Sequence, residues 1–188
     1  MANIKTIAIV GATGTMGSAI ARALSKTPDY RLLLISTDED KLVDLKLELA
    51  KSKVEAFAIS CAREASWEAD IIIVATPYEA EREVVEKIRE VATGKIVISI
   101  SNPLNEAYND LVTSPDSSAA EELQKLLPYS KVVKTFNTTF AADFMTPVID
   151  GKTADAFIAG NNSDAVEVVS GLVKVAGFNP VIVGDLTV

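Results

Sequence analysis

Three glycines near the start of the chain have a spacing that suits phosphate binding. Gly11, Gly14 and Gly17 follow the apolar run Ile7–Val10 and precede an amphipathic segment. Glycines in this arrangement allow a sharp turn after a strand, clear space for a ligand and let a helix pack closely on the strand. The N–H groups and the positive dipole at the start of that helix attract an anion. The pattern predicts a pyrophosphate site for a dinucleotide, although an ordinary tight turn has the same spacing.

Missing residue types exclude several chemistries. The chain has no histidine, which is the usual proton donor and acceptor of alcohol and hydroxy-acid dehydrogenases. A single cysteine, Cys61, leaves no intrachain disulfide and no cysteine-rich metal site, and we predict no bound metal. None of the four tyrosines is followed four positions later by lysine, so the Tyr-x-x-x-Lys pair of short-chain dehydrogenases is missing. No Gly-x-Ser-x-Gly elbow of hydrolases occurs either.

Composition and charge limit the class of protein. The 188 residues are 48% hydrophobic and 23% charged, which is typical of one globular domain, and we expect residues 1–188 to form it. The net charge of −8 disfavours nucleic acid as a partner. No signal peptide precedes the first apolar run, and the apolar runs are too short to span a bilayer. We therefore expect a cytoplasmic protein with a small-molecule partner and no membrane partner.

Short apolar runs alternate with amphipathic segments, which predicts a Rossmann-type α/β fold. Strands are predicted at Thr6–Val10, Leu32–Ser36, Glu55–Ile59, Ile71–Ala75, Ile96–Ser99, Val132–Thr135, Ala156–Ala159 and Pro180–Val183. Helices are predicted at Thr15–Ser25, Asp40–Lys51, Tyr78–Val91, Ser118–Leu127 and Ser163–Ala176. Most of the strand runs are apolar throughout, as in strands that are covered on both faces. We expect one doubly wound, mostly parallel sheet of about eight strands.

Ligands of such sheets bind beyond the carboxyl ends of the strands. The loops expected at these ends carry polar and turn residues, and they are Gly11–Gly17, Ser36–Asp40, Thr76–Tyr78, Ser99–Asn105 and Asn137–Asp143. The candidate site is therefore assembled from loops that lie far apart in the sequence.

Several of these loops together resemble one family. Gly11–Gly17, Ser36, Thr76–Tyr78 and Lys131–Thr138, with Ser118–Glu121 upstream of the last motif, are similar to the deazaflavin coenzyme F420-dependent NADP oxidoreductases. The cytosolic domains of the STEAP metalloreductases are related to that group. The resemblance extends over essentially the whole chain.

The resemblance implies hydride transfer between a nicotinamide dinucleotide and a flavin- or deazaflavin-like ring. It implies a phosphate site at Gly11, Thr13, Gly14, Thr15, Met16 and Gly17, and an adenosine ribose site at Ser36, Thr37 and Asp38. The nicotinamide half would lie near Thr76, Pro77, Tyr78 and Ser101, and the substrate face would include Asn102, Pro103, Asn137 and Thr138. The last two side chains could equally satisfy loop backbone. We assign no catalytic acid or base, because hydride exchange between two rings depends on proximity and orientation.

The residues after the second predicted strand depart from the family pattern. Thr37 stands where the family normally has an arginine that pairs with the 2′-phosphate of NADP, and the acidic run Asp38–Asp40 follows. Asp38 lies close to where an acid accepts a hydrogen bond from the ribose 2′-OH of NAD. Alternatively, Asp38 or Asp40 caps the next helix, and Lys41 compensates the charge. The local residues favour NAD, whereas the resemblance favours NADP.

Relatives that reduce deazaflavins continue with further helices, which help to build the substrate pocket and the dimer. We expect this chain to lack those helices, and we leave a homodimer open. Two other functions also stay open. One is a reductase with a separate helical domain, of the pyrroline-5-carboxylate or β-hydroxyacid kind. The other is a non-catalytic dinucleotide-binding module that senses redox state or regulates a partner.

Overall fold

One eight-stranded sheet runs through the computed structural model, which describes residues 4–107 and 109–187. The strand order is β10-β9-β6-β5-β4-β1-β2-β3. The bounds are β1 Lys5–Val10, β2 Tyr30–Ile35, β3 Glu55–Ala58, β4 Ile71–Val74, β5 Ile96–Ser99, β6 Lys131–Thr135, β9 Asp155–Gly160 and β10 Asn179–Gly184. Strands β1 to β6 pair in parallel, and β9 is antiparallel to β6. This confirms the predicted Rossmann-type α/β fold with a mostly parallel sheet.

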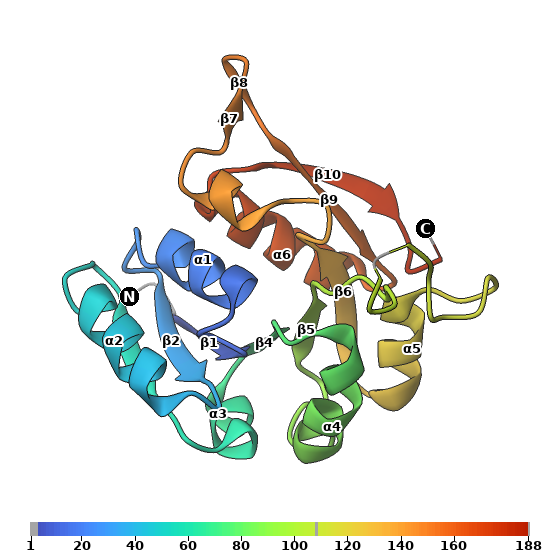
Figure 1. Ribbon diagram of the computed structural model, residues 1–188, viewed down its shortest axis with the longest axis horizontal. Helices are drawn as coiled ribbons and strands as arrows, with labels where there is room; N and C mark the ends of the chain where they lie inside the picture. Colours follow the sequence, from blue (N-terminus) through green and yellow to red (C-terminus); the bar gives the residue numbers. More distant parts are fainter. Residues whose placement is uncertain (1–3, 108, 188) are drawn as a thin grey trace.

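Helices cover both faces of the sheet (Figure 1). Their bounds are α1 Thr15–Leu24, α2 Glu39–Leu49, α3 Ala62–Glu68, α4 Tyr78–Ile88, α5 Ala119–Leu126 and α6 Ser163–Val175. Leu24, Leu45 and Val169 place α1, α2 and α6 in one hydrophobic core, and Val85 and Leu123 place α4 and α5 in the other. Because successive side chains of a strand point to opposite faces, the continuous apolar strands supply both cores.

The structure contains elements that the sequence pattern did not predict. These are helix α3, a short 3-10 helix (η1, Ala141–Phe144) and a hairpin of β7 (Val148–Ile149) and β8 (Lys152–Thr153) that projects from the body in Figure 1. The hairpin strands have two residues each and are exposed, so they lack the apolar pattern of a buried strand. The eight predicted strands and five predicted helices are all present, with ends that differ by at most three residues.

Candidate dinucleotide and substrate site

The glycine turn after β1 is closely packed against its neighbours. The N–H groups of Gly11 and Ala12 both donate to the carbonyl of Ile35, at 2.9 Å. Gly11 has a φ of +88°, and a Cβ there would lie 2.5 Å from the carbonyl oxygen of Ala75. A Cβ on Gly17 would lie 2.2 Å from the carbonyl oxygen of Gly11. Only glycine therefore fits at positions 11 and 17, and the two residues fix the shape of the turn.

The helix that follows this turn begins without a cap. Asp38, Ser118 and Asn162 cap α2, α5 and α6 by accepting hydrogen bonds from their first turns, whereas Gly14 offers α1 no side-chain cap. The first turn of α1 also carries no acidic residue. The N–H groups at a helix start need acceptors, and the dipole there is positive. The start of α1 is therefore suited to an anion.

Two cavities meet at the glycine turn, and both share Gly14, Ala75, Thr76 and Pro77 in their walls. The β2-side cavity has a volume of about 810 Å³ and lies among the loops after β1, β2 and β3 and one face of α4. The β5-side cavity, about 850 Å³, lies among the loops after β1, β4, β5 and β6. A ligand that spans both cavities would cross the open start of α1.

Ser36 and Asp38 have different roles at the end of β2. The hydroxyls of Ser36 and Thr13 share a hydrogen bond of 2.5 Å, and the N–H of Asp38 donates to Ser36 Oγ at 3.0 Å. The Asp38 carboxylate accepts from the Lys41 N–H at 3.1 Å and pairs with Lys41 Nζ at 2.7 Å. The hydrogen bond from the Lys41 side chain holds the pKa of Asp38 below its usual value. Asp38 is thus the cap of α2, one of the two roles left open by the sequence, and it does not line either cavity.

The β5-side cavity contains a buried hydroxyl that suits a polar ligand. Thr76 Oγ1 has no hydrogen-bond partner among the described residues, although the side chain lines both cavities. Pro77 and Tyr78 follow at the start of α4 and line the same wall. A buried hydroxyl without a partner is costly, so a ligand that bonds to it gains affinity. The open helix start, the bare Gly14 and this hydroxyl fit a dinucleotide.

Two asparagines join the loops after β5 and β6. Asn102 Nδ2 donates to the carbonyl of Asn137 at 2.8 Å, and Asn137 Nδ2 donates to Asn102 Oδ1 at 3.3 Å. Just before Asn137, buried Phe136 has a φ of +61°, which is rare for an aromatic residue. The Phe136 carbonyl accepts the hydroxyl of Thr139 at 2.8 Å, which closes the turn. The strained turn sets the direction in which Asn137 leaves β6.

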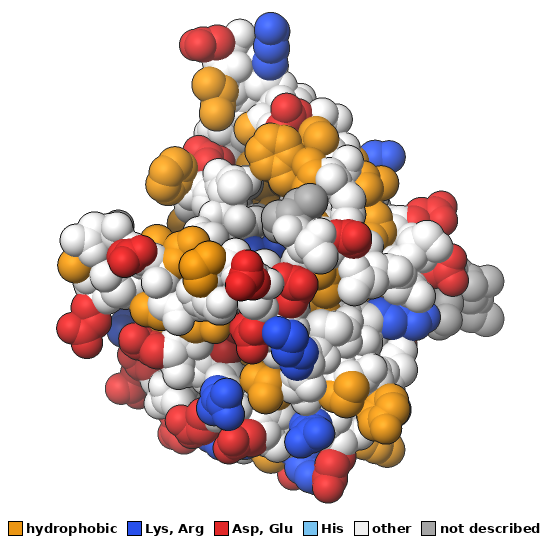
Figure 2. Space-filling model, turned by 90° about the vertical axis from the view of Figure 1, so that its right-hand side faces the viewer, with side chains coloured by type: hydrophobic (Ala, Val, Ile, Leu, Met, Phe, Trp, Pro, Cys, Tyr) orange, Lys and Arg blue, Asp and Glu red, His pale blue; other side chains and the backbone are white. Residues whose placement is uncertain are grey.

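A third cavity, of about 750 Å³, lies on the other side of this asparagine pair. This β9-side cavity shares Asn102 and Asn137 with the β5-side cavity and is lined by Pro103, Thr138, Leu111, Phe157 and Val183 among others. Figure 2 faces the side of the molecule with α5 and the end of β10, where hydrophobic side chains lie between acidic ones. Lys134 is the one basic residue of its described wall. These walls suit a ligand with a substantial apolar surface.

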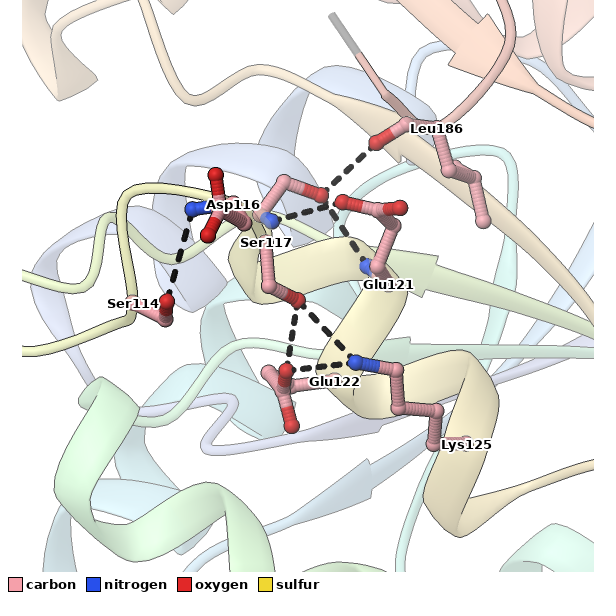
Figure 3. Close-up of polar contacts among 8 residues, drawn as sticks. Ser114, Asp116, Ser117, Glu121, Glu122, Lys125 and Leu186 are labelled. Carbon is pink, nitrogen blue, oxygen red and sulfur yellow. Dashed lines mark hydrogen bonds and ion pairs between the residues drawn. The ribbon is translucent and has the colours of Figure 1, made fainter.

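The start of α5, at the edge of the β9-side cavity, is closed by its own side chains. Ser118 Oγ accepts from the N–H of Glu121 at 3.1 Å and donates to the carbonyl of Leu186 at 2.7 Å, and the Glu121 carboxylate accepts from the Ser118 N–H (Figure 3). This predicted capping box is present in full. Two donors at the start of α5, the N–H groups of Ser118 and Glu121, are therefore already bonded to side chains, whereas no side chain caps α1.

The structure places the predicted residues around the three cavities as follows. The β2-side cavity is lined by Gly11, Thr13, Gly14, Ser36, Thr37, Thr76 and Pro77. The β5-side cavity is lined by Gly14, Thr15, Met16, Thr76, Pro77, Tyr78, Ser101, Asn102 and Asn137, and the β9-side cavity by Asn102, Pro103, Asn137 and Thr138. Of the predicted set, Gly17 and Asp38 line none of the three.

Sequence reasoning missed part of the walls. Residues 60–63, which contribute to the β2-side cavity, were not predicted, whereas Phe140 and Ala141 of the β5-side cavity lie in the predicted loop Asn137–Asp143. Residues 60–63 follow a predicted strand, so the rule that ligands bind at the carboxyl ends of strands could have found them. The described residues contain no cluster of three or more His, Cys, Asp or Glu suited to a metal ion. No helix in the described part of the chain is long and apolar enough to cross a membrane.

The fold places the chain among the Rossmann-type α/β proteins. A family model described as "NADP oxidoreductase coenzyme F420-dependent" matches residues 6–103. The F420-dependent NADP reductase of Methanocaldococcus jannaschii is 32% identical over 193 residues, which cover 96% of this chain and 84% of that protein. The chain belongs to the coenzyme F420-dependent NADP oxidoreductase family, which confirms the resemblance seen in its motifs and the prediction of an oxidoreductase.

Solved structures show the same fold over nearly the whole chain. A crystal structure from Arthrobacter sp. FB24, described as a candidate F420-dependent NADP-reductase, has a TM-score of 0.83 at 24% identity and covers 98% of this chain and 86% of that one. The hypothetical protein SMa0349 of Sinorhizobium meliloti has a TM-score of 0.79 at 30% identity, and the coverage is 97% of this chain and 86% of that one.

Proposed function

We propose that this protein transfers hydride between NADP(H) and the deazaflavin coenzyme F420. In the forward direction NADPH gives up a hydride, and the deazaflavin ring gains that hydride together with a proton from solvent. The proposal is carried by membership of the F420-dependent family, whose curated relatives are named as NADP reductases. The open start of α1 between two connected cavities supports it, since a dinucleotide needs both features.

The proposed dinucleotide lies across the β2-side and β5-side cavities. Its phosphates face Thr13, Gly14, Thr15 and Met16 at the start of α1, where backbone N–H groups donate to them. The adenosine ribose lies against Ser36 and Thr37, and the nicotinamide half lies against Thr76, Pro77, Tyr78 and Ser101. Gly11 and Gly17 act by shaping the turn. In our proposal the dinucleotide-binding domain extends over residues 1–188.

The structure also bears on the choice between NAD and NADP. An acid that accepts from the ribose 2′-OH of NAD needs a free carboxylate, but the Asp38 carboxylate already holds the cap of α2 and Lys41. The partial neutralisation by Lys41 lowers the repulsion of a 2′-phosphate. Ser36 and Thr37 bring hydroxyl groups to the same wall. These features fit NADP, the cofactor named in the family, in spite of the missing arginine at position 37.

The substrate face of the proposed site lies at the asparagine pair. Asn102 and Asn137 line both the β5-side and the β9-side cavity, so their amides reach a ring that lies against the nicotinamide. Pro103 and Thr138 extend this face into the β9-side cavity. In the proposal these residues orient the two rings and exclude water, and no side chain exchanges a proton with the substrates.

The deciding experiment is an acceptor screen with the purified protein. NADPH or NADH is combined with F420, FMN, riboflavin or a ferric chelate, and oxidation of the nicotinamide is followed. We expect the highest kcat/KM for NADPH with F420. Tight NADPH binding without turnover on any acceptor would instead support the non-catalytic module and refute the proposal.

We also propose a cytoplasmic homodimer whose partners are small molecules rather than nucleic acid. The net charge of −8 opposes nucleic-acid binding. Strand β10 forms one edge of the sheet, and its Ile182 is 62% exposed. An open edge with exposed apolar side chains is prone to pair with a second copy. Light scattering during gel filtration tests this, because a mass near 20.0 kDa would show a monomer.

A further inference from the structure

Two charged residues from different elements hold Ser101. Glu81 of α4 is 4% exposed and accepts a hydrogen bond from Ser101 Oγ at 2.6 Å. Lys134 of β6, which is partly buried, donates to the carbonyl of Ser101 and, at 3.4 Å, to the hydroxyl of Ser99. The hydroxyl of Ser101 is therefore bound by an acidic side chain and its carbonyl by a basic one.

The burial of two ionisable side chains is unfavourable in free energy. Burial raises the pKa of Glu81, and burial lowers the pKa of Lys134 to about 8. Desolvation thus disfavours the charged form of each group. Buried charge pairs often contribute no more to stability than apolar side chains of similar size, and in some proteins they specify geometry instead. Stability alone gives no reason for these charges, whereas their hydrogen bonds fix the position of Ser101.

Glu81 and Lys134 hold Ser101, which lies in the loop that carries the substrate face of the proposed site. Ser101 directly precedes Asn102, and the Asn102–Asn137 pair separates the β5-side cavity from the β9-side cavity. Lys134 itself lines the β9-side cavity, three residues before Asn137. A shift of Ser101 would therefore move the asparagine pair and the wall against which both rings lie.

We propose that Glu81 and Lys134 are positioning residues, which hold Ser101 so that the Asn102–Asn137 pair aligns the nicotinamide with its hydride acceptor. This inference rests on the proposed function and names residues that lie beyond the predicted site. Neither residue needs to touch the substrates. Glu81 and Lys134 affect the alignment of the rings more than cofactor affinity, which depends mainly on the start of α1.

The test compares variants of the three residues with a control on the same strand. Ser101→Ala and Lys134→Met should lower kcat with F420 by about 10- to 100-fold, since small misplacements of reacting groups have effects of this size. For Lys134→Met, whose residue lies outside both walls of the proposed dinucleotide site, the Kd for NADPH should stay within about twofold, a factor worth under 0.5 kcal/mol. Glu81→Gln keeps an oxygen acceptor for Ser101 and should retain most of the wild-type kcat. Lys134→Arg keeps a cationic donor and should retain a higher kcat than Lys134→Met. Lys131→Met, on β6 outside the three cavity walls, should change neither value.

Two results would overturn the positioning role. One is a kcat that is unchanged in both Ser101→Ala and Lys134→Met. The other is a loss in Glu81→Gln as large as in Lys134→Met, because charge rather than position would then govern the rate.

A second measurement does not depend on turnover. Amide hydrogen exchange of residues 100–102, 104 and 105 should be faster in Ser101→Ala and Lys134→Met than in the wild type and in Lys131→Met, and exchange in the strands far from this loop should not change. If the wild type does not turn over F420 but exchange rises as expected, the proposed function fails and the structural link from Lys134 to the loop stands. If the wild type turns over and exchange does not change in either variant, the inference fails by itself.

Discussion

At the scale of single residues, Gly14 is the position where a side chain would first reach the proposed phosphate site. Its φ of −66° suits any residue, and a Cβ there would lie 3.2 Å from the Gly11 carbonyl oxygen, a tight contact that requires a shift of a few tenths of an ångström. We therefore expect Gly14→Asp to fold and to lose NADPH binding, because its carboxylate faces the anion site. Titration by NADPH fluorescence measures this. Gly171→Asp, in open space on α6, is the matched control. Unchanged affinity in folded Gly14→Asp would remove the basis for the phosphate site.

Asp38 allows a test of cofactor choice that leaves the helix cap in place. Asparagine caps a helix about as well as aspartate, so Asp38→Asn removes a charge without melting the start of α2. With less repulsion of the 2′-phosphate, and with Lys41 released from its ion pair, NADPH affinity should rise relative to NADH. We expect about two- to fivefold, the size of a partly screened charge interaction. Asp44→Asn on α2 is the control. The dissociation constants of NADPH and NADH are measured for the wild type and for both variants. An unchanged ratio would mean that residue 38 does not influence the ribose site.

At the scale of elements, the start of α5 ties the chain end to the body. Ser118 is both the cap of α5 and a hydrogen-bond donor to the Leu186 carbonyl. We expect Ser118→Ala to lower the free energy of unfolding by about 1–2 kcal/mol, from the lost cap and the unpaired carbonyl. Urea denaturation measures the change, and Ser114→Ala, in the exposed loop nearby, should leave it within about 0.5 kcal/mol. A loss no larger than that of the control would contradict a structural role for the cap.

The elements differ in how well they can be predicted from the sequence. Ile71–Val74 reads as a buried strand because every residue is apolar and buried. Helix α3 has only seven residues, of which Ala65 and Ser66 are buried, so it shows no apolar face of helical period. The turn at Phe136 is also hidden, since no sequence rule places an aromatic residue at positive φ. The glycine turn and its neighbouring loops could be predicted, whereas the link from Glu81 through Ser101 to Lys134 needs three-dimensional packing to be seen.

At the scale of the whole molecule, three cavities arise where loops separated in sequence meet at the carboxyl ends of the strands. The strand order brings the ends of β1 and β4 together, so that Gly14 and Thr76 share two cavity walls. The same order brings the loops after β5 and β6 together at Asn102 and Asn137. The two proposed substrates thus meet near the middle of the row of carboxyl ends, and β9 together with the edge strand β10 supplies the outer wall of the β9-side cavity.

The net charge of the molecule predicts an unusual salt dependence. A protein of charge −8 repels anionic NADPH at long range, while the attraction by the start of α1 acts only at contact. The screening length falls from about 30 Å at 0.01 M salt to about 8 Å at 0.15 M salt. Salt therefore weakens the long-range repulsion more than the short-range attraction at the start of α1. We expect the association rate of NADPH, measured by stopped-flow fluorescence, to rise over this range. NADH, which lacks the 2′-phosphate, should show a smaller rise. An association rate that falls steadily with salt would mean that a local positive field guides NADPH to the site, against the overall charge.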